Sequence, residues 1–305
     1  MAGALAIVRA RQDVHVIAAA TAVFAWGTGP VMNKVMTVDT PAIVFYRTLL
    51  GAPLMILIAR ATGGGLSRDL LKRTALPGVL FAFSFITGFA SVKMTSIANA
   101  TLITTIQPVL VLFVAPRMFG ERLSARQLGY SLLSLAGVLM VVMAAASSSG
   151  AHVSGDLMAV ANVVLWTAYF LLAKKSRLAG VHSWSFLAAI FTWLAVVVLP
   201  FGLVASNDLG NMTMKDWLCA VGMTVGPGVV GHGLMTWSQS HVDVTIASLL
   251  GLMSPVVSTL LALAFLGELL TLGQVMGGVV VLLSLGLLVR HQQMGDPRPA
   301  ADVPA

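Results

Sequence analysis

The sequence has few charged residues and a single cysteine. Only 10% of its 305 residues are charged and 58% are hydrophobic, whereas a soluble domain carries about 25% charged residues. So little charge does not cover a water-exposed surface, and so high an apolar content excludes a disordered chain. Cys219, as the only cysteine, excludes a disulfide framework and a cysteine-based structural zinc site. A helical protein with several membrane spans remains.

The sequence predicts an all-α integral membrane protein with ten transmembrane helices. Its mean hydropathy is +0.93, and a hydrocarbon core about 30 Å thick is crossed by about 20 apolar residues of helix. The chain therefore has room for roughly ten crossings joined by short loops. The expected spans are Val14–Met32, Pro41–Ala59, Ala75–Ser91, Ile97–Phe119, Leu128–Ala146, Leu157–Ala173, Ser185–Ala205, Trp217–Ser238, Thr245–Leu266 and Leu272–Val289.

The basic residues fall at the ends of the apolar segments. Despite a net charge of +7, this placement favours a role in membrane topology over nucleic-acid binding. If the amino terminus is inside, most lysines and arginines lie on the inner side, which predicts a multi-pass protein of the plasma or inner membrane with both termini cytoplasmic. The inner set is Arg9, Arg11, Arg60, Arg68, Lys72, Arg73, Arg117, Arg122, Arg126, Lys174, Lys175, Arg177, Arg290 and Arg298, and the outer set is Lys34, Lys93 and Lys215.

The two halves of the chain repeat one another. Trp26 and Lys34 recur 140 residues later as Trp166 and Lys174. Each half holds five expected spans, an odd number, so the second half enters the membrane from the opposite side. We predict two inverted five-helix repeats, residues 1–150 and 151–291, and a short cytoplasmic tail, residues 292–305; such opposed halves favour alternating access. Further matches, 147 residues apart, pair Pro108, Gly120, Glu121, Leu123 and Gln127 with Pro255, Gly267, Glu268, Leu270 and Gln274.

These motifs resemble the EamA-type transporters of the drug/metabolite transporter superfamily. The similarity lies in Trp26–Gly27 with Lys34, in Arg47, and in the runs from Pro108 to Glu121 and from Ser254 to Glu268. It implies two inverted repeats and export of small organic metabolites, amino-acid-like or drug-like. The expected function is secondary transport by alternating access, with neither enzymatic activity nor a cofactor. The expected partners are the lipid bilayer, a small-molecule substrate and, as a candidate coupling ion, the proton.

Helix-breaking prolines mark the middles of the fourth and ninth spans. Pro108 and Pro255 each remove a backbone hydrogen bond, and in lipid the freed carbonyl is tolerated only against protein or a watery cavity. We expect these kinks to line a cavity, although packing alone would also explain them. The candidate substrate-binding residues, aromatic and polar ones included, are Trp26, Asn33, Thr105, Gln107, Pro108, Asn162, Trp166, Tyr169, Met253, Ser254 and Pro255.

Two tryptophans and a tyrosine form the aromatic part of this set. Trp166 and Tyr169 are three residues apart, so they share a helix face, and Asn162 lies one turn before Trp166. Such a face could stack on a planar or cationic substrate. Core packing is the alternative for all three aromatic residues, Trp26 included.

Arg47 and His232 are candidates for coupling or charge recognition within the spans. Charges inside a membrane are costly and tend to be functional. Arg47 could bind substrate or could bond carbonyls between the repeats. His232 lies deep in the eighth span and could carry a coupling proton, because histidine titrates near neutral pH. The alternative is a neutral histidine bonded to a neighbouring carbonyl.

Two lysines and two glutamates at span ends are candidates for gates or structural latches. They are Lys34 and Lys174, which end the first and sixth spans, and Glu121 and Glu268, which follow repeated glycines at opposite faces. A carboxylate near a helix start is stabilised by the exposed backbone N–H groups there. Plain interfacial anchoring is the alternative for the lysines.

A membrane enzyme and a channel are the competing functions. An enzyme needs converging acid–base or nucleophilic groups, which the sequence does not place together inside the membrane. A channel would favour a repeated ring of like residues. Two inverted halves suit a transporter better than either.

Overall fold

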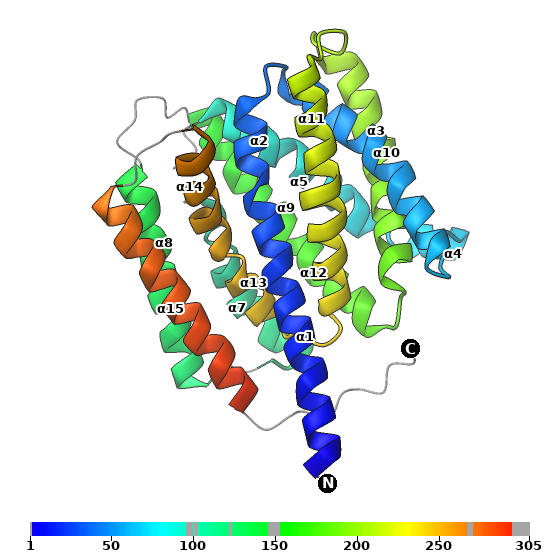
Figure 1. Cartoon of the computed structure of the whole chain (residues 1–305). Helices are drawn as coiled ribbons and strands as arrows, with labels where there is room; N and C mark the ends of the chain where they lie inside the picture. The colour runs from blue at the N-terminus through cyan, green and yellow to red at the C-terminus, as the bar shows by residue number, and fades with distance from the viewer. Residues whose placement is uncertain are drawn as a thin grey trace.

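The computed structural model describes residues 2–95, 100, 103–121, 124–145, 153–266 and 271–294, and in these ranges it contains helices and no strands (Figure 1). The prediction of an all-helical membrane protein agrees with this architecture. In the described residues, seven helical segments are long and apolar enough to span a membrane. They are Asp13–Val35, Thr40–Ala61, Ala75–Met94, Val153–Leu178, Ser183–Ala205, Met214–Ser238 and Val244–Phe265, with shorter apolar helices at Gln107–Phe119 and Leu272–Leu288.

The helices follow the expected apolar segments closely. Short loops separate them, and several expected spans consist of more than one helix. In chain order the described helices are α1 (Ala2–Gly27), α2 (Gly29–Val35), α3 (Thr40–Ala61), α4 (Arg68–Arg73), α5 (Ala75–Met94), α7 (Gln107–Phe119), α8 (Ala125–Ala145), α9 (Val153–Leu178), α10 (Ser183–Ala205), α11 (Met214–Met223), η1 (Thr224–His232), α12 (Gly233–Ser238), α13 (Val244–Leu250), α14 (Met253–Leu266) and α15 (Leu272–Met294).

The helices pack as a bundle with an apolar outer surface. Helix α5 lies along α9, α3 along α10, and α8 along α15, while α1 packs against η1, α12 and α14 (Figure 1). Apolar side chains fill the interior, and others such as Phe113 and Val204 face outward. An outward apolar surface matches lipid, because the hydrocarbon core is as apolar as these side chains.

Prolines and glycines break three of the expected spans. The first span is interrupted at Thr28, and Pro30 stands in the first turn of α2. The ninth span divides into α13 and α14 at Gly251–Leu252. The fourth span is interrupted at Thr105–Ile106, just before α7. Pro108 and Pro255 stand in the first turn of the following helix, where a missing N–H costs nothing.

The eighth span contains a feature that the sequence analysis did not predict. Its middle, η1, is wound as a π-helix of nine residues that ends at His232 and contains Pro227. Proline has no N–H to donate to the carbonyl four residues earlier, so the α-helical pattern fails there. Wide turns of this kind often occur at functional sites. The signal in the sequence is the Gly-Pro-Gly run at positions 226–228.

We call the end of the bundle where α1 begins the lower end, and the opposite end the upper end (Figure 1).

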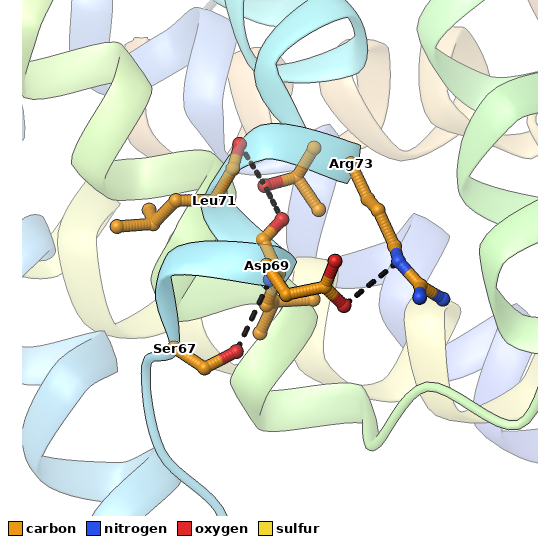
Figure 2. Close-up of polar contacts among 6 residues, drawn as sticks. Ser67, Asp69, Leu71 and Arg73 are labelled. Atoms are coloured by element: carbon orange, nitrogen blue, oxygen red, sulfur yellow. Dashed lines mark hydrogen bonds and ion pairs between the residues drawn. The ribbon is translucent and has the colours of Figure 1, made fainter.

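The exposed helix α4 follows α3 at the lower end. Its start is capped by Ser67, which accepts a hydrogen bond from the Leu70 N–H at 3.1 Å. Asp69 and Arg73 form an exposed ion pair at 2.8 Å (Figure 2). Exposed pairs contribute little to stability.

Candidate functional site

The two tryptophans related by the repeat meet inside the bundle. Trp26 on α1 and Trp166 on α9 have ring centroids 5.5 Å apart and planes at 82°. Trp166 also contacts Tyr169 at 5.3 Å, with both residues on the same side of α9. Edge-to-face pairs of this kind are favourable beyond their buried area. The structure thus brings together the three aromatic residues that the sequence singles out.

His232 and Phe81 complete this aromatic centre. The His232 ring lies 5.3 Å from Trp26 and 5.9 Å from Trp166. Phe81 on α5 contacts His232 at 5.2 Å and Trp166 at 6.0 Å. Phe81 is a site residue that the sequence analysis missed, because nothing in the apolar third span distinguishes it from its phenylalanine neighbours. We call Trp26, Phe81, Trp166, Tyr169 and His232 the aromatic centre.

The Trp26 indole is held close to a glycine and has no hydrogen-bond partner. A Cβ added at Gly231 would lie 2.5 Å from the Trp26 Nε1, so only glycine leaves room for the ring. This Nε1–H is buried, and no described group accepts a hydrogen bond from it. A buried donor without a partner is unusual and calls for a physical explanation.

The helix breaks of the ninth span lie beside α1. Ser258 donates a hydrogen bond to the Gly27 carbonyl at 2.8 Å. A Cβ at Gly27 would lie 3.2 Å from the Ser254 carbonyl oxygen, so the start of α14 touches the residue after Trp26. Met253 packs on the same apolar cluster as Trp26 and Trp166. Of the cavity candidates in the ninth span, Met253 and Ser254 therefore lie next to the aromatic centre; Pro255 follows them.

The candidates of the fourth span lie near the break of the ninth span, where α7 packs against α13. Thr105 is buried at the break, and Pro108 is buried in the first turn of α7. The Gln107 Oε1 lies 4.0 Å from where a Cβ of Gly251 would stand. The two breaks thus approach each other, since Gly251 belongs to the break of the ninth span. The repeated prolines place two interrupted helices side by side.

The two asparagine candidates lie on α9 and α2. Asn162 on α9 accepts a hydrogen bond from the Ser84 hydroxyl at 2.8 Å, and a Cβ at Gly88 would lie 3.1 Å from its side chain. Asn162 therefore joins α9 to α5. Asn33 on α2 is buried, and its Oδ1 has no described partner.

Arg47 lies on α3, next to α5 and η1. Its Nη2 donates to the Met223 carbonyl at 3.0 Å. This carbonyl is four residues before Pro227, which cannot donate to it. The guanidinium also lies 4.8 Å from the Phe85 ring centroid and 4.9 Å from that of Phe89. Arg47 thus adds a donor at the carbonyl to which Pro227 cannot donate.

Glu121 and Lys174 form contacts at the lower end. The Glu121 carboxylate accepts from the Val244 N–H at 2.7 Å and from the Thr245 N–H at 3.0 Å, which caps the start of α13. Lys174 donates to the Val242 carbonyl at 2.6 Å. Burial raises the pKa of Glu121, and Asp243 raises it further. We call these contacts the lower latch; Glu268, the repeat counterpart of Glu121, lies outside the described residues, and Lys34 is exposed on α2.

Acidic residues hold the upper end, and the sequence analysis did not select them. Asp216 is fully buried and accepts from the Thr37 N–H at 2.8 Å and from the Thr213 N–H at 3.0 Å. Asp39 accepts from the Ser206 hydroxyl at 2.8 Å. We call these contacts the upper latch. Their sequence signal is weak, because each aspartate resembles an ordinary helix cap at a span edge.

A family model now identifies this architecture. The EamA-like transporter family matches residues 14–143 and 153–290, most of both halves. The chain belongs to the EamA-like transporter family. The resemblance inferred from the repeated motifs is confirmed, and so is the prediction that the protein is a transporter.

Relatives of this EamA-like transporter are named as transporters and exporters. An uncharacterized transporter of Archaeoglobus fulgidus is 26% identical over 88% of this chain and 92% of its own length. The pseudopaline exporter of Pseudomonas aeruginosa is 27% identical over 74% of this chain and 80% of its own. The aromatic amino acid exporter of Ancylobacter novellus is 28% identical over 79% of this chain and 85% of its own length.

A solved crystal structure shares the fold of this EamA-like transporter. It superposes with a TM-score of 0.74 at 22% sequence identity and covers 90% of this chain and 98% of its own. At this identity the similarity concerns the fold. The helical arrangement is therefore one that an experimental structure also contains.

Proposed function

We propose that this EamA-like transporter exports small organic molecules that have a flat apolar part, by alternating access around the aromatic centre. The observation that carries the proposal is the contact between Trp26 and Trp166, because residues related by an inverted repeat meet only near the axis between the halves. Transporter sites lie at that position. The unpartnered Trp26 Nε1–H supports a cargo that accepts a hydrogen bond.

The proposed architecture has ten transmembrane helices in two inverted five-helix repeats, residues 1–150 and 151–291. The packing supports it, because the contacts map onto one another when the halves are exchanged. Helix α5 lies along α9, which is a contact between the third and the sixth expected span. When the halves are exchanged, it becomes a contact between the eighth and the first span. This contact is also present, because η1 and α12 pack against α1. The paired breaks before Pro108 and Pro255 support it as well.

We place the protein in the plasma membrane. In the proposed orientation, the lower end and both termini face the cytoplasm. The lower end carries Arg60, Arg68, Arg117 and Arg126, whereas few basic residues follow the upper span ends. Positive charge favours the cytoplasmic side. In this orientation the lower latch closes the path to the cytoplasm.

The names of the relatives support the proposed cargo class. One is named as an exporter of aromatic amino acids and another as an exporter of pseudopaline. Trp26 and Trp166 are in direct contact in this structure, and we infer that an aromatic cargo ring stacks on their indoles when the rings separate. Each stacked aromatic contact is worth about 1 kcal/mol.

Counterflow in proteoliposomes tests the proposal. Vesicles loaded with unlabelled L-tryptophan are given the labelled amino acid, and transient accumulation is measured for the wild type, Trp166→Ala, Gln107→Ala and Trp217→Ala. We expect accumulation by the wild type and by Trp217→Ala, whose partly exposed ring contacts Tyr46, and strong loss in Trp166→Ala and Gln107→Ala. Equal accumulation by all four proteins would refute the proposed site.

His232 is the proposed proton carrier. Four aromatic rings surround it, those of Trp26, Phe81, Trp166 and Phe191. We infer that it exchanges a proton when cargo leaves and water enters. His232→Gln should abolish accumulation driven by a pH gradient and spare exchange at equal pH. An unchanged response to the gradient would exclude this role.

A further inference from the structure

Arg47 is a buried cation without an acidic partner among the described residues. Its side chain is 7% exposed. Within the part of the chain that the structure describes, its guanidinium donates a hydrogen bond to the Met223 carbonyl and lies over the rings of Phe85 and Phe89. Its Nε is buried and has no hydrogen-bond partner. Taking a charge out of water is expensive, so buried charges are normally paired with an opposite charge.

A continuous aromatic wall joins this cation to the aromatic centre. Phe85, below the guanidinium, contacts Phe81 with centroids 5.8 Å apart. Phe81 in turn contacts Trp166 and His232. A guanidinium thus lies at one end of a row of packed aromatic rings whose other end is the tryptophan pair.

We propose that Arg47 binds the carboxylate of the cargo, and that the transporter therefore selects small aromatic carboxylates. The inference rests on the proposed function, because it assigns the other end of the same molecule to Arg47. The flat ring would lie in the aromatic centre and the carboxylate would reach the unpartnered Nε. A guanidinium presents N–H groups in a planar fork that matches a carboxylate.

A purely structural role is the competing explanation of Arg47. The bond to Met223 stabilises η1 whatever the cargo is. The two roles differ in one consequence that can be measured. A structural arginine affects stability and the binding of every cargo equally, whereas a carboxylate site distinguishes molecules with a carboxylate from those without one.

Three indoles of matched ring structure test this difference. L-tryptophan carries an amine and a carboxylate, indole-3-propionate only the carboxylate, and tryptamine only the amine. Binding of each to the purified full chain is measured by titration calorimetry. We expect the wild type to bind the two carboxylates about tenfold or more tightly than tryptamine, as for a hydrogen bond to a charged group.

Arginine variants sharpen the test. Arg47→Gln should bind all three indoles with the weak affinity of tryptamine, and Arg47→Lys, which keeps the charge but not the fork, should retain part of the preference. Arg60→Gln is the matched control, an exposed arginine on the same helix, and should bind like the wild type. Thermal unfolding of each variant shows whether it is folded.

The outcomes separate this inference from the proposed function. If the wild type binds tryptamine as tightly as the two carboxylates, Arg47 is not a carboxylate site, although the aromatic centre would still bind cargo. If none of the three indoles binds, both the inference and the proposed cargo class are wrong. If Arg47→Gln does not fold, the wild-type series alone decides.

Discussion

The two ends of the bundle differ in the side chains that make their polar contacts. At the upper end, the carboxylates of Asp39 and Asp216 accept hydrogen bonds from backbone and hydroxyl groups. At the lower end, Lys174 donates to the Val242 carbonyl, Arg177 donates to the Thr236 carbonyl at 3.1 Å, and the Glu121 carboxylate accepts from the Val244 N–H. Asp39 and Asp216 at the upper end and Glu121 at the lower end join the two halves of the chain, whereas the bonds of Lys174 and Arg177 lie within the second half.

Under the proposed alternating-access mechanism, this arrangement combines a stable centre with ends that separate. The aromatic centre is apolar and makes few directional bonds. The latches consist of individual hydrogen bonds, each worth about 1 to 3 kcal/mol when a charged group takes part. Such bonds exchange for water when an end opens. The basic donors at the lower end also agree with its proposed cytoplasmic orientation.

The largest effect is expected from the upper latch. Asp216→Ala removes the acceptor of the Thr37 and Thr213 groups at a fully buried position. We expect a loss of about 3 kcal/mol or more in the free energy of unfolding, because several hydrogen bonds to one charge are lost together. Urea unfolding in detergent measures it. Asp69→Asn, at an exposed ion pair, is the control and should change stability by less than about 0.5 kcal/mol; equal losses would contradict the account.

A substitution in the lower latch should lower the free energy of unfolding less than Asp216→Ala does, and should change the balance between transport states more. Lys174→Met leaves the buried Val242 carbonyl without its donor, at a cost of about 1 to 3 kcal/mol. Since this bond holds α9 to the segment between α12 and α13 at the lower end, we expect its loss to favour a state that is open at that end. Accessibility of an introduced cysteine at Ser240 to a membrane-impermeant thiol reagent, in a Cys219→Ser background, should rise. Lys175→Met, the exposed neighbour, is the control, and a rise of the same size there would exclude the latch.

The smallest effect is expected from the pH response of Glu121. Burial raises its pKa in the latched structure, so the latched form binds its proton more readily than an unfolded chain does. Its contribution to stability is therefore present below the ordinary glutamate pKa and is lost as the pH rises through the raised value. Thermal unfolding midpoints of the wild type, compared with Glu121→Gln, should fall more from pH 4 to pH 8. Parallel curves for the two proteins would refute this linkage.

Much of the fold follows from the sequence, because hydropathy indicates the helical spans and the repeated residues indicate the family. The helical class, most span limits and the family were predictable from apolar run lengths and from Trp26, Pro108 and their counterparts. The internal breaks were only partly predictable. A proline shows where an N–H is missing, but whether the chain answers with a break, as before Pro255, or with a π-helix, as around Pro227, depends on neighbouring helices.

The site was predictable where an aromatic or titratable side chain lies within an otherwise aliphatic span. Trp26, Trp166 and His232 stand out among aliphatic residues, and the structure brings them together. Phe81 and Phe85 do not stand out, because their role arises from α5 lying along α9. Asp216 was missed because a buried acceptor of four hydrogen bonds and a surface helix cap look alike in one sequence.

Spin-label distances at both ends test the central claim most directly. In a Cys219→Ser background, one label pair is placed at Ser124 and Ser240 of the lower end and another at Met94 and Gly210 of the upper end. Distances are compared between the otherwise wild-type chain and Lys174→Met. The account predicts a longer lower distance together with a shorter upper one. Lengthening at both ends, or no change at the upper end, would contradict alternating access around the aromatic centre.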